Sequence, residues 1–171
     1  MKTASGTIQT PIGPLLAAAT DQGLTSLLFD PEAQAHDTHP VLDLARTELD
    51  AYFRGDLRDF TVPVAQEGTP FQQRVWDELR RIPYGHTISY AQLAARVGNP
   101  AAVRAVGGAN GANNVPIIVP CHRVIAADGT LGGFGGGLDR KRRLLAIEHI
   151  SLFNPAIHSA PGPSRHVSPS L

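Results

Sequence analysis

The clearest chemical potential lies in one short run, where the chain's single cysteine is followed by a histidine. Cys121 comes directly after Pro120, which restricts the backbone and favours an extended approach to the cysteine. Cysteine attacks as a thiolate, so its site must lower the thiol pKa or supply a base. Because neighbouring side chains point in different directions, we expect a water to carry the thiol proton from Cys121 to His122.

An imidazole that acts as a base is usually oriented by a carboxylate. Glu148 is the best candidate, because Asp128 and Asp139 occupy apparent turn and cap positions. Cys121, His122 and Glu148 would then form a triad that generates a thiolate. Two plainer interpretations stay open: a lone cysteine is most often a small buried hydrophobe, and His122 could simply fill a hydrogen-bonding position.

Helices in the second half of the chain must position this run. Thr69, Pro70 and Gln72 predict a capped helix that runs to about residue 81. A second helix is expected over residues 89–97 and a third over 101–109, and the turn between them contains Gly98. Helix, glycine-containing turn and helix is the helix-turn-helix pattern. The third helix carries small side chains and a single charge, which permits close approach to DNA or close helix packing: Ala101, Ala102, Arg104, Ala105, Gly107, Gly108 and Ala109.

The segments on either side of the cysteine also have recognisable patterns. Residues 115–119 are apolar apart from Pro116 and predict a buried strand. Glycines surround Phe134, and Asp139 is expected to cap a last helix that runs to about residue 150, with basic residues at its start and Glu148 near its end. Proline and serine from residue 154 onward predict a disordered tail.

The first half of the chain predicts a different kind of domain. Alternating residues over 7–10, 15–20 and 24–29 predict a three-stranded meander. Apolar spacing over 40–53 predicts a helix that ends at Gly55, and alternation over 60–64 predicts a short strand. The expected organisation is therefore an α/β domain over 1–68, a mainly helical domain over 69–153 and a tail over 154–171.

Composition excludes several classes of protein. A hydrophobic content of 42% supports a packed core. No apolar stretch approaches the roughly 20 residues that span a bilayer, and no signal peptide is evident, so we expect a cytoplasmic protein without a membrane partner. Residues 1–68 hold four Lys/Arg and ten Asp/Glu, whereas residues 69–150 hold ten and five. A basic half is suited to a polyanion, although surface charge can also be unequal by chance.

The segment from Val119 to Ile125 resembles the active-site signature of the O6-alkylguanine-DNA alkyltransferases, also called methylated-DNA–protein-cysteine methyltransferases. Distant companions match at consistent spacing: Ser89-Tyr90, Arg104-Ala105-Val106-Gly107, Asn113, Phe134 in its glycine-rich loop, and Glu148. The resemblance covers roughly residues 3–150. It implies a ribonuclease H-like N-terminal domain with a small antiparallel sheet and a helix, followed by a winged-helix-like domain that contains the helix-turn-helix.

The same resemblance implies how double-stranded DNA would be bound. The family flips the alkylated guanine out of the duplex and places the second helix of its helix-turn-helix in the minor groove. Ala105 and Gly107 would permit that approach, and Arg104 would fill the gap left by the flipped base. Tyr90 would contact guanine N3 and donate a proton to the leaving base. Arg123 completes the expected set of DNA-contacting residues.

Further roles in the base pocket follow by resemblance. Asn113 would be the hinge between the helix-turn-helix and the cysteine segment, and Phe134 would pack against the base. The Gly135 amide would donate to O6; several relatives carry serine there, so this chain keeps the N–H and lacks the hydroxyl. The carbonyl groups of Cys121 and Val124 would accept from the exocyclic amine.

The implied reaction is a single displacement that leaves the alkyl group on Cys121 as a thioether, so each molecule repairs one lesion. We expect a monomer without an organic cofactor and without zinc, because the thiols that bind zinc in some relatives are absent. The range of alkyl groups, activity on O4-alkylthymine and cooperativity on DNA stay open. Two alternatives differ in class: a non-enzymatic lesion-sensing DNA binder, whose relatives carry tryptophan at the cysteine position, and a cysteine hydrolase, whose base usually lies far from the nucleophile in sequence.

Overall fold

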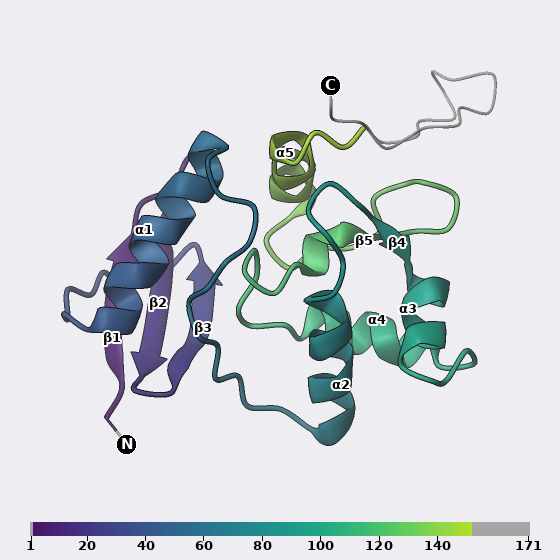
Figure 1. Ribbon diagram of the computed structural model, residues 1–171, viewed down its shortest axis with the longest axis horizontal. Coiled ribbons are helices and arrows are strands. Elements are labelled where there is room, and N and C mark those ends of the chain that lie inside the picture. Colours follow the sequence, from purple (N-terminus) through teal and green to yellow (C-terminus); the bar gives the residue numbers. More distant parts are fainter. Residues whose placement is uncertain (1, 152–171) are drawn as a thin grey trace. The chain divides into compact units, whose positions relative to one another are not determined.

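The computed structural model describes residues 2–151, and the tail predicted over 154–171 lies outside the described residues. Contacts divide the chain into two units, and Figure 1 colours the chain by residue number along the sequence. Unit 1 comprises Met1–Gly68 together with Asn114–Ile118, and unit 2 comprises Thr69–Asn113 together with Val119–Leu171. The chain thus leaves unit 2 for five residues and re-enters it just before the cysteine.

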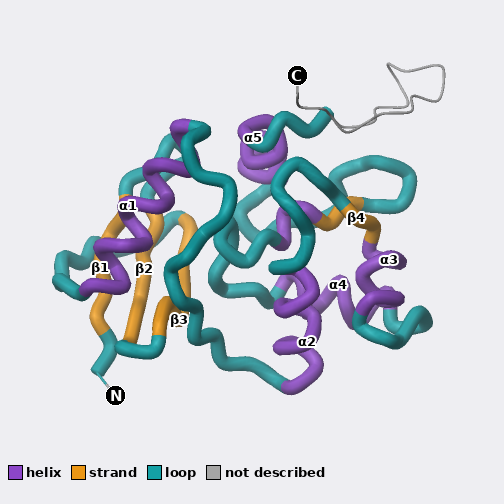
Figure 2. Tube along the Cα trace, in the orientation of Figure 1, coloured by secondary structure: helices purple, strands orange, loops and turns teal. Residues whose placement is uncertain are grey.

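Unit 1 is built on an antiparallel sheet with one helix packed against it (Figure 2). Its strands are β1 (Ala4–Ile8), β2 (Leu15–Thr20) and β3 (Gly23–Phe29), in the order β1-β2-β3, which confirms the predicted meander. Alternate residues of β1 and β2 are buried, as a sheet with one covered face requires.

The helix of unit 1, α1 (Pro40–Arg54), begins and ends through local signals. At its start, His39 Nδ1 accepts from the Val41 amide at 3.1 Å. At its end, Gly55 has a φ of 84°, a left-handed conformation that favours glycine, as the sequence predicts. An apolar face formed by Leu42, Ala45 and Leu49 is buried.

The strand predicted over 60–64 is wrong, because a buried carboxylate takes the backbone donors that a sheet would use. Glu48 of α1 accepts from the amides of Thr61 and Val62, both at 2.9 Å. Only Val64 forms a bridge, with Leu24 of β3. The alternation of apolar residues therefore indicates burial in this segment and does not indicate strand pairing.

The strand predicted over 115–119 is also wrong. Its residues are buried, but Ile117 has a φ of 76° and the segment turns. Pro116 has no N–H to give to a sheet. Residues 114–118 belong to unit 1, where the Leu27 amide donates to the Asn114 carbonyl at 2.7 Å.

Unit 2 is mainly helical, as predicted, and two short helices joined by a turn lie where the sequence predicts a helix-turn-helix. Its elements are α2 (Pro70–Leu79), β4 (Ile88–Ser89), α3 (Tyr90–Arg96), α4 (Val103–Gly111), the 3-10 turn η1 (Cys121–Arg123), β5 (Val124–Ile125) and α5 (Leu138–Ile147). The capping box predicted at Thr69 is present, and Ser89 forms a second one with Gln92. The indole N–H of Trp76 donates to the Ala109 carbonyl at 2.9 Å and ties α2 to α4.

Two helix starts in unit 2 differ from expectation. The third predicted helix begins at Val103 and not at Ala101, because Ala102 first closes a turn onto the Asn99 carbonyl at 2.9 Å. The N-cap of α5 is Gly137 and not Asp139, which lies in the first turn of the helix. There the carboxylate still complements the helix dipole.

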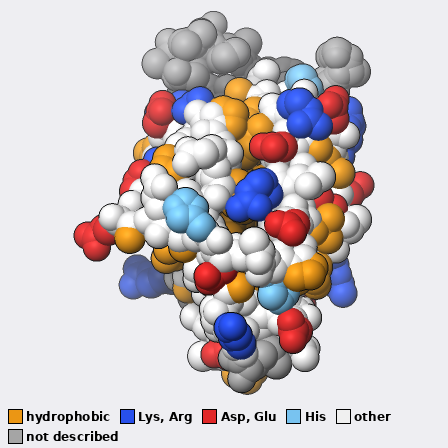
Figure 3. All heavy atoms as spheres, turned by 90° about the vertical axis from the view of Figure 1, so that its left-hand side faces the viewer, with side chains coloured by type: hydrophobic (Ala, Val, Ile, Leu, Met, Phe, Trp, Pro, Cys, Tyr) orange, Lys and Arg blue, Asp and Glu red, His pale blue; other side chains and the backbone are white. Residues whose placement is uncertain are grey.

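The surface of the α1 side carries charges of both signs. Figure 3 shows basic and acidic side chains intermixed on this face, with small apolar areas between them. Within residues 2–151, no helix is long and apolar enough to cross a membrane.

The contacts of Glu48 predict a stability effect at a position remote from any nucleophile. Glu48→Gln replaces one acceptor oxygen by an amide that faces backbone N–H groups, so unfolding should require about 1–3 kcal/mol less free energy. Urea denaturation measures this, and Asp50→Asn on the exposed side of the same helix is the matched control. Equal midpoints for the two variants would contradict this account of the 60–64 segment.

Candidate active site

Cys121 opens the turn η1 and is only 6% exposed. Burial raises the pKa of its thiol to about 11, although a hydrogen bond from Asn113 and the positive charge of Lys141 both act to lower it. At neutral pH the sulfur therefore holds its proton, and attack on an electrophile requires a group that removes it.

His122 is completely buried and its Nε2 lies 2.7 Å from a carboxylate oxygen of Glu148, the partner that the sequence predicts. Burial lowers the pKa of His122 more than the nearby carboxylate raises it, so the imidazole is neutral at neutral pH. A neutral imidazole that donates from Nε2 has an acceptor at Nδ1. In the described part of the chain, this Nδ1 is buried and has no hydrogen-bond partner.

The carboxylate of Glu148 is shared between His122 and Arg123. Arg123 donates from Nε at 2.8 Å and from Nη2 at 3.0 Å, one bond to each carboxylate oxygen. Burial acts to raise the pKa of Glu148, but His122 and Arg123 outweigh it and hold that pKa well below its usual range. Glu148 is therefore ionised at neutral pH, and both of its carboxylate oxygens accept hydrogen bonds from His122 or Arg123.

Arg123 is buried against Glu148 and does not lie at the surface. Its side chain is buried, and besides the two bonds to Glu148 it donates from Nη1 to the Ile82 carbonyl at 2.7 Å. A guanidinium engaged in this way holds Glu148 in place, and these buried contacts do not favour the predicted DNA contact at Arg123.

Lys141 is a buried residue of this site that its sequence position did not single out, because it stands among the basic residues at the start of α5. It is completely buried, and its Nζ donates to the carbonyls of Val124, Leu131 and Gly133 at 2.7, 2.6 and 2.9 Å. Burial lowers its pKa to about 8, so it is still charged at neutral pH. A signal was present: Lys141 lies three, four and seven residues before Leu144, Leu145 and Glu148, the spacing of one helix face.

Tyr90, at the start of α3, is held between two glycines. A Cβ on Gly132 would lie 2.8 Å from the Tyr90 hydroxyl, and one on Gly107 would lie 3.9 Å from its ring. Burial raises the pKa of Tyr90, while a hydrogen bond with the backbone of Gly133 acts to lower it. The phenol is therefore a protonated donor at neutral pH. Position 132 has a φ of 71° and lies close to the Tyr90 hydroxyl, so it admits only glycine.

Asn113 follows α4 and connects that helix to the cysteine segment. Its side-chain amide donates to the Val119 carbonyl at 2.7 Å, and the side chain also hydrogen-bonds Cys121. The remaining predicted residues lie nearer the surface: Arg104, Ala105 and Gly135 are exposed, whereas Phe134 and Gly107 are half-buried. Val124 is buried, and its carbonyl already accepts from Lys141.

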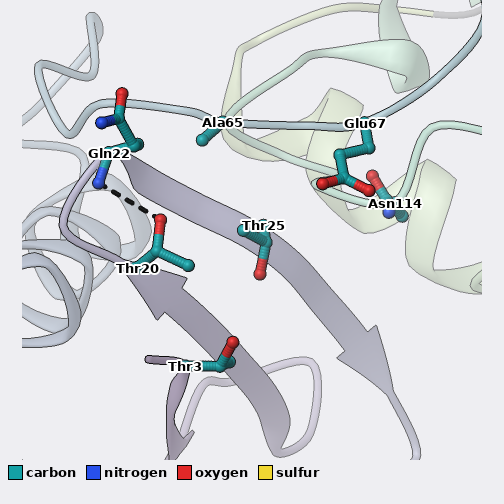
Figure 4. Close-up of a pocket in the computed structure, with 7 residues that line it drawn as sticks. All are labelled: Thr3, Thr20, Gln22, Thr25, Ala65, Glu67 and Asn114. Atoms are coloured by element: carbon teal, nitrogen blue, oxygen red, sulfur yellow. Dashed lines mark hydrogen bonds between the residues drawn. The ribbon is translucent and has the colours of Figure 1, made fainter. Parts of the chain in front are cut away.

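Unit 1 has a hollow of its own, of about 530 Å³. Figure 4 shows its lining of hydroxyl and amide side chains with one carboxylate and one alanine: Thr3, Thr20, Gln22, Thr25, Ala65, Glu67 and Asn114. This lining holds neither a cysteine nor a histidine, so the chemistry described above belongs to unit 2.

The contacts of Lys141 predict that it stabilises unit 2. Lys141→Met keeps much of the apolar stem but leaves three buried carbonyls without their donor, which should lower the free energy of unfolding by at least about 2 kcal/mol. Urea denaturation measures the loss. Arg142→Met, an exposed position on the same helix, should change stability by less than about 0.5 kcal/mol, and equal losses for both variants would contradict this role.

Two family models together match nearly all of the described chain. Residues 70–150 match the 6-O-methylguanine DNA methyltransferase DNA binding domain, and residues 4–66 match the ribonuclease-like domain of the same methyltransferases. Among curated relatives, the methylated-DNA–protein-cysteine methyltransferase of Mycobacterium tuberculosis is 49% identical over 148 residues, which are 83% of this chain and 90% of that protein. The constitutive enzyme of Bacillus subtilis is 45% identical over 156 residues, 85% of this chain and 94% of its own.

A solved structure agrees with these matches. The Mycobacterium tuberculosis protein OGT in complex with DNA superposes with a TM-score of 0.77 at 49% identity, covering 85% of this chain and 92% of that chain. The matching models, the identity of the relatives and the shared fold lead to one assignment: this chain belongs to the 6-O-methylguanine DNA methyltransferase family.

Proposed function

We propose that this protein repairs O6-alkylguanine in DNA by moving the alkyl group irreversibly onto Cys121. The observation that carries this proposal is the orientation of His122, the residue after Cys121, whose Nε2 is fixed by Glu148 while its Nδ1 is a buried acceptor without a partner in the described chain. Membership of a family whose curated relatives are methylated-DNA–protein-cysteine methyltransferases supports the same reaction.

The proton moves first. A water between the two side chains accepts the thiol proton of Cys121 and gives a proton to His122 Nδ1, which leaves a thiolate and an imidazolium. The imidazolium is stabilised by the ionised carboxylate of Glu148 at 2.7 Å. General base catalysis of this kind contributes roughly 10²–10⁴-fold to a rate.

Displacement at carbon follows. The sulfur forms a bond to the alkyl carbon while the bond from that carbon to guanine O6 breaks, and the electron pair stays with the base. Tyr90, protonated and half-buried, donates a proton to N3 of the departing guanine. The product thioether has no ionisable proton and is a poor leaving group, so one protein molecule removes one alkyl group.

DNA would be bound through the helix-turn-helix of α3 and α4. The exposed side of α4 carries Arg104 and Ala105, a single charge among small side chains that allows close approach to the minor groove. Arg104 would occupy the gap left by the flipped guanine, while Phe134 and the Gly135 amide would receive the base. We further propose that the protein acts as a monomer in the cytoplasm.

Two other functions fit less well. A non-enzymatic lesion binder has no use for a cysteine held beside an oriented base, and Cys121 occupies the position where such relatives carry tryptophan. The base of a cysteine hydrolase usually lies far from its nucleophile in sequence, whereas His122 follows Cys121 directly, and the family to which the chain belongs is not a hydrolase family.

Cys121→Ser tests the nucleophile. A hydroxyl is far less ionised than a thiol, so this variant should bind O6-methylguanine duplex as the unaltered protein does and transfer no methyl group. Transfer is measured with a methyl-labelled duplex, and the unaltered protein should take up one label per molecule at most. Repair by the serine variant, or more than one label per unaltered molecule, would contradict the proposal.

Arg104→Ala tests base flipping. Loss of the side chain that fills the gap should slow methyl removal from duplex DNA more than reaction with the free base O6-methylguanine, because only the duplex must be opened. Single-turnover rates on both substrates give the comparison, and Arg142→Ala provides an exposed basic control outside the helix-turn-helix. Equal slowing on the two substrates would reject this role for Arg104.

A further inference from the structure

Two side-chain atoms in the described chain are buried without a hydrogen-bond partner, and both belong to residues in contact with the cysteine segment. One is Nδ1 of His122, discussed above. The other is Oδ1 of Asn110, on the last turn of α4. Buried polar atoms rarely lack partners, so two such atoms on residues that adjoin Cys121 call for a common explanation.

The orientation of the Asn110 amide follows from its neighbour. Its Nδ2 lies 3.4 Å from the Cys121 carbonyl oxygen, and only an N–H can face a carbonyl favourably. The amide is therefore fixed with its oxygen directed elsewhere in the buried interior, where Asn110 is only 5% exposed.

Both unpartnered atoms are acceptors, which points to a single donor that can serve two of them. His122 donates from Nε2 to Glu148, so its Nδ1 can only accept while the ring is neutral. A water has two hydrogens to donate and a lone pair left to accept from the Cys121 thiol. Buried waters are held by two to four such partners.

We propose that Asn110 is a positioning residue of the alkyl-acceptor site, whose Oδ1 holds the water that carries the Cys121 proton to His122. This inference rests on the proposed function. Before transfer, the water accepts from the thiol and donates to both His122 Nδ1 and Asn110 Oδ1. After transfer, it accepts from the imidazolium Nδ1–H, donates to the new thiolate, and keeps its bond to Asn110.

The bond to Asn110 is therefore the one contact of the water that does not change during the reaction. It prevents the water from turning away from the line between sulfur and imidazole, so proton transfer needs no reorientation. Asn113 has a different role from Asn110. Its side chain hydrogen-bonds the Cys121 thiol group and donates to the Val119 carbonyl.

Charged and titratable groups around the relay set its pH dependence. Glu148 and Lys141 face it from α5, Arg123 from η1, and Tyr90 from α3. Asn110 is neutral, so its replacement leaves these charges in place and changes only how the water is held.

The first test is a high-resolution crystal structure of the unaltered protein. We expect a water within hydrogen-bond distance of both Asn110 Oδ1 and His122 Nδ1. Absence of that water, or a protein donor on either atom, would overturn the inference. The result does not depend on activity, so it is distinct from a failure of methyl transfer, which would reject the proposed function instead.

The second test is the pH profile of single-turnover methyl transfer at saturating duplex. Asn110→Leu should be slowed roughly tenfold or more at pH 7. The deficit should shrink by pH 9, because a variant without the relay depends on thiolate formed directly, and that fraction grows roughly tenfold per pH unit below a thiol pKa of about 11.

A structural role would give a different profile, with the same deficit at every pH, and that result would overturn the inference. Gln22→Leu, an amide-to-leucine change at an exposed position of unit 1, is the matched control and should follow the unaltered protein. If Asn110→Leu does not fold, the crystal structure of the unaltered protein decides alone.

Discussion

The buried carboxylate of Glu148 is the constraint on which the site depends. A charge without water around it is stable only when its oxygens are paired, and here His122 and Arg123 supply those partners at 2.7–3.0 Å. This pairing fixes the tautomer of His122, because a carboxylate at Nε2 requires a hydrogen there. The same pairing explains why Arg123 is buried, because a guanidinium is rarely buried unless it is paired.

Lys141, another buried charge of the site, has a different role. Lys141 draws together the carbonyls of Val124, Leu131 and Gly133, so it joins the segment after the nucleophile to the loop that precedes Phe134. Its positive charge also favours the thiolate once the proton leaves Cys121. A sulfur that is buried and protonated at rest is a poor target for oxidants, because the thiolate is the reactive form. That protection suits a protein whose cysteine can be used once.

Local signals in the sequence were sufficient for the helices and the meander. Capping boxes at Thr69 and Ser89 and the glycine after α1 act within a few residues, so they can be recognised without the fold. The conformations around residues 62 and 117 do not follow from the local sequence pattern. Glu48 accepts from the backbone amides of the first segment, and the left-handed backbone of Ile117 turns the second.

The same distinction between local signals and tertiary contacts applies to the residues of the site. The pairing of His122 with Glu148 could be predicted, because a base needs an oriented imidazole and only one carboxylate was well placed. The burial of Arg123 and Lys141 could not be inferred from their type, since both usually lie at the surface. Asn110 carried no signal in the sequence at all. Its interest comes from an oxygen that folding leaves without a donor.

The whole reaction depends on the sulfur of Cys121 taking the alkyl carbon and keeping it. The most direct measurement is the intact mass of the protein after incubation with an O6-methylguanine duplex, followed by mapping of the modified peptide. A gain of one methylene unit located on Cys121, stable over prolonged incubation, is the predicted result. An unchanged mass while the DNA is repaired, or a methyl group on any other residue, would contradict the account.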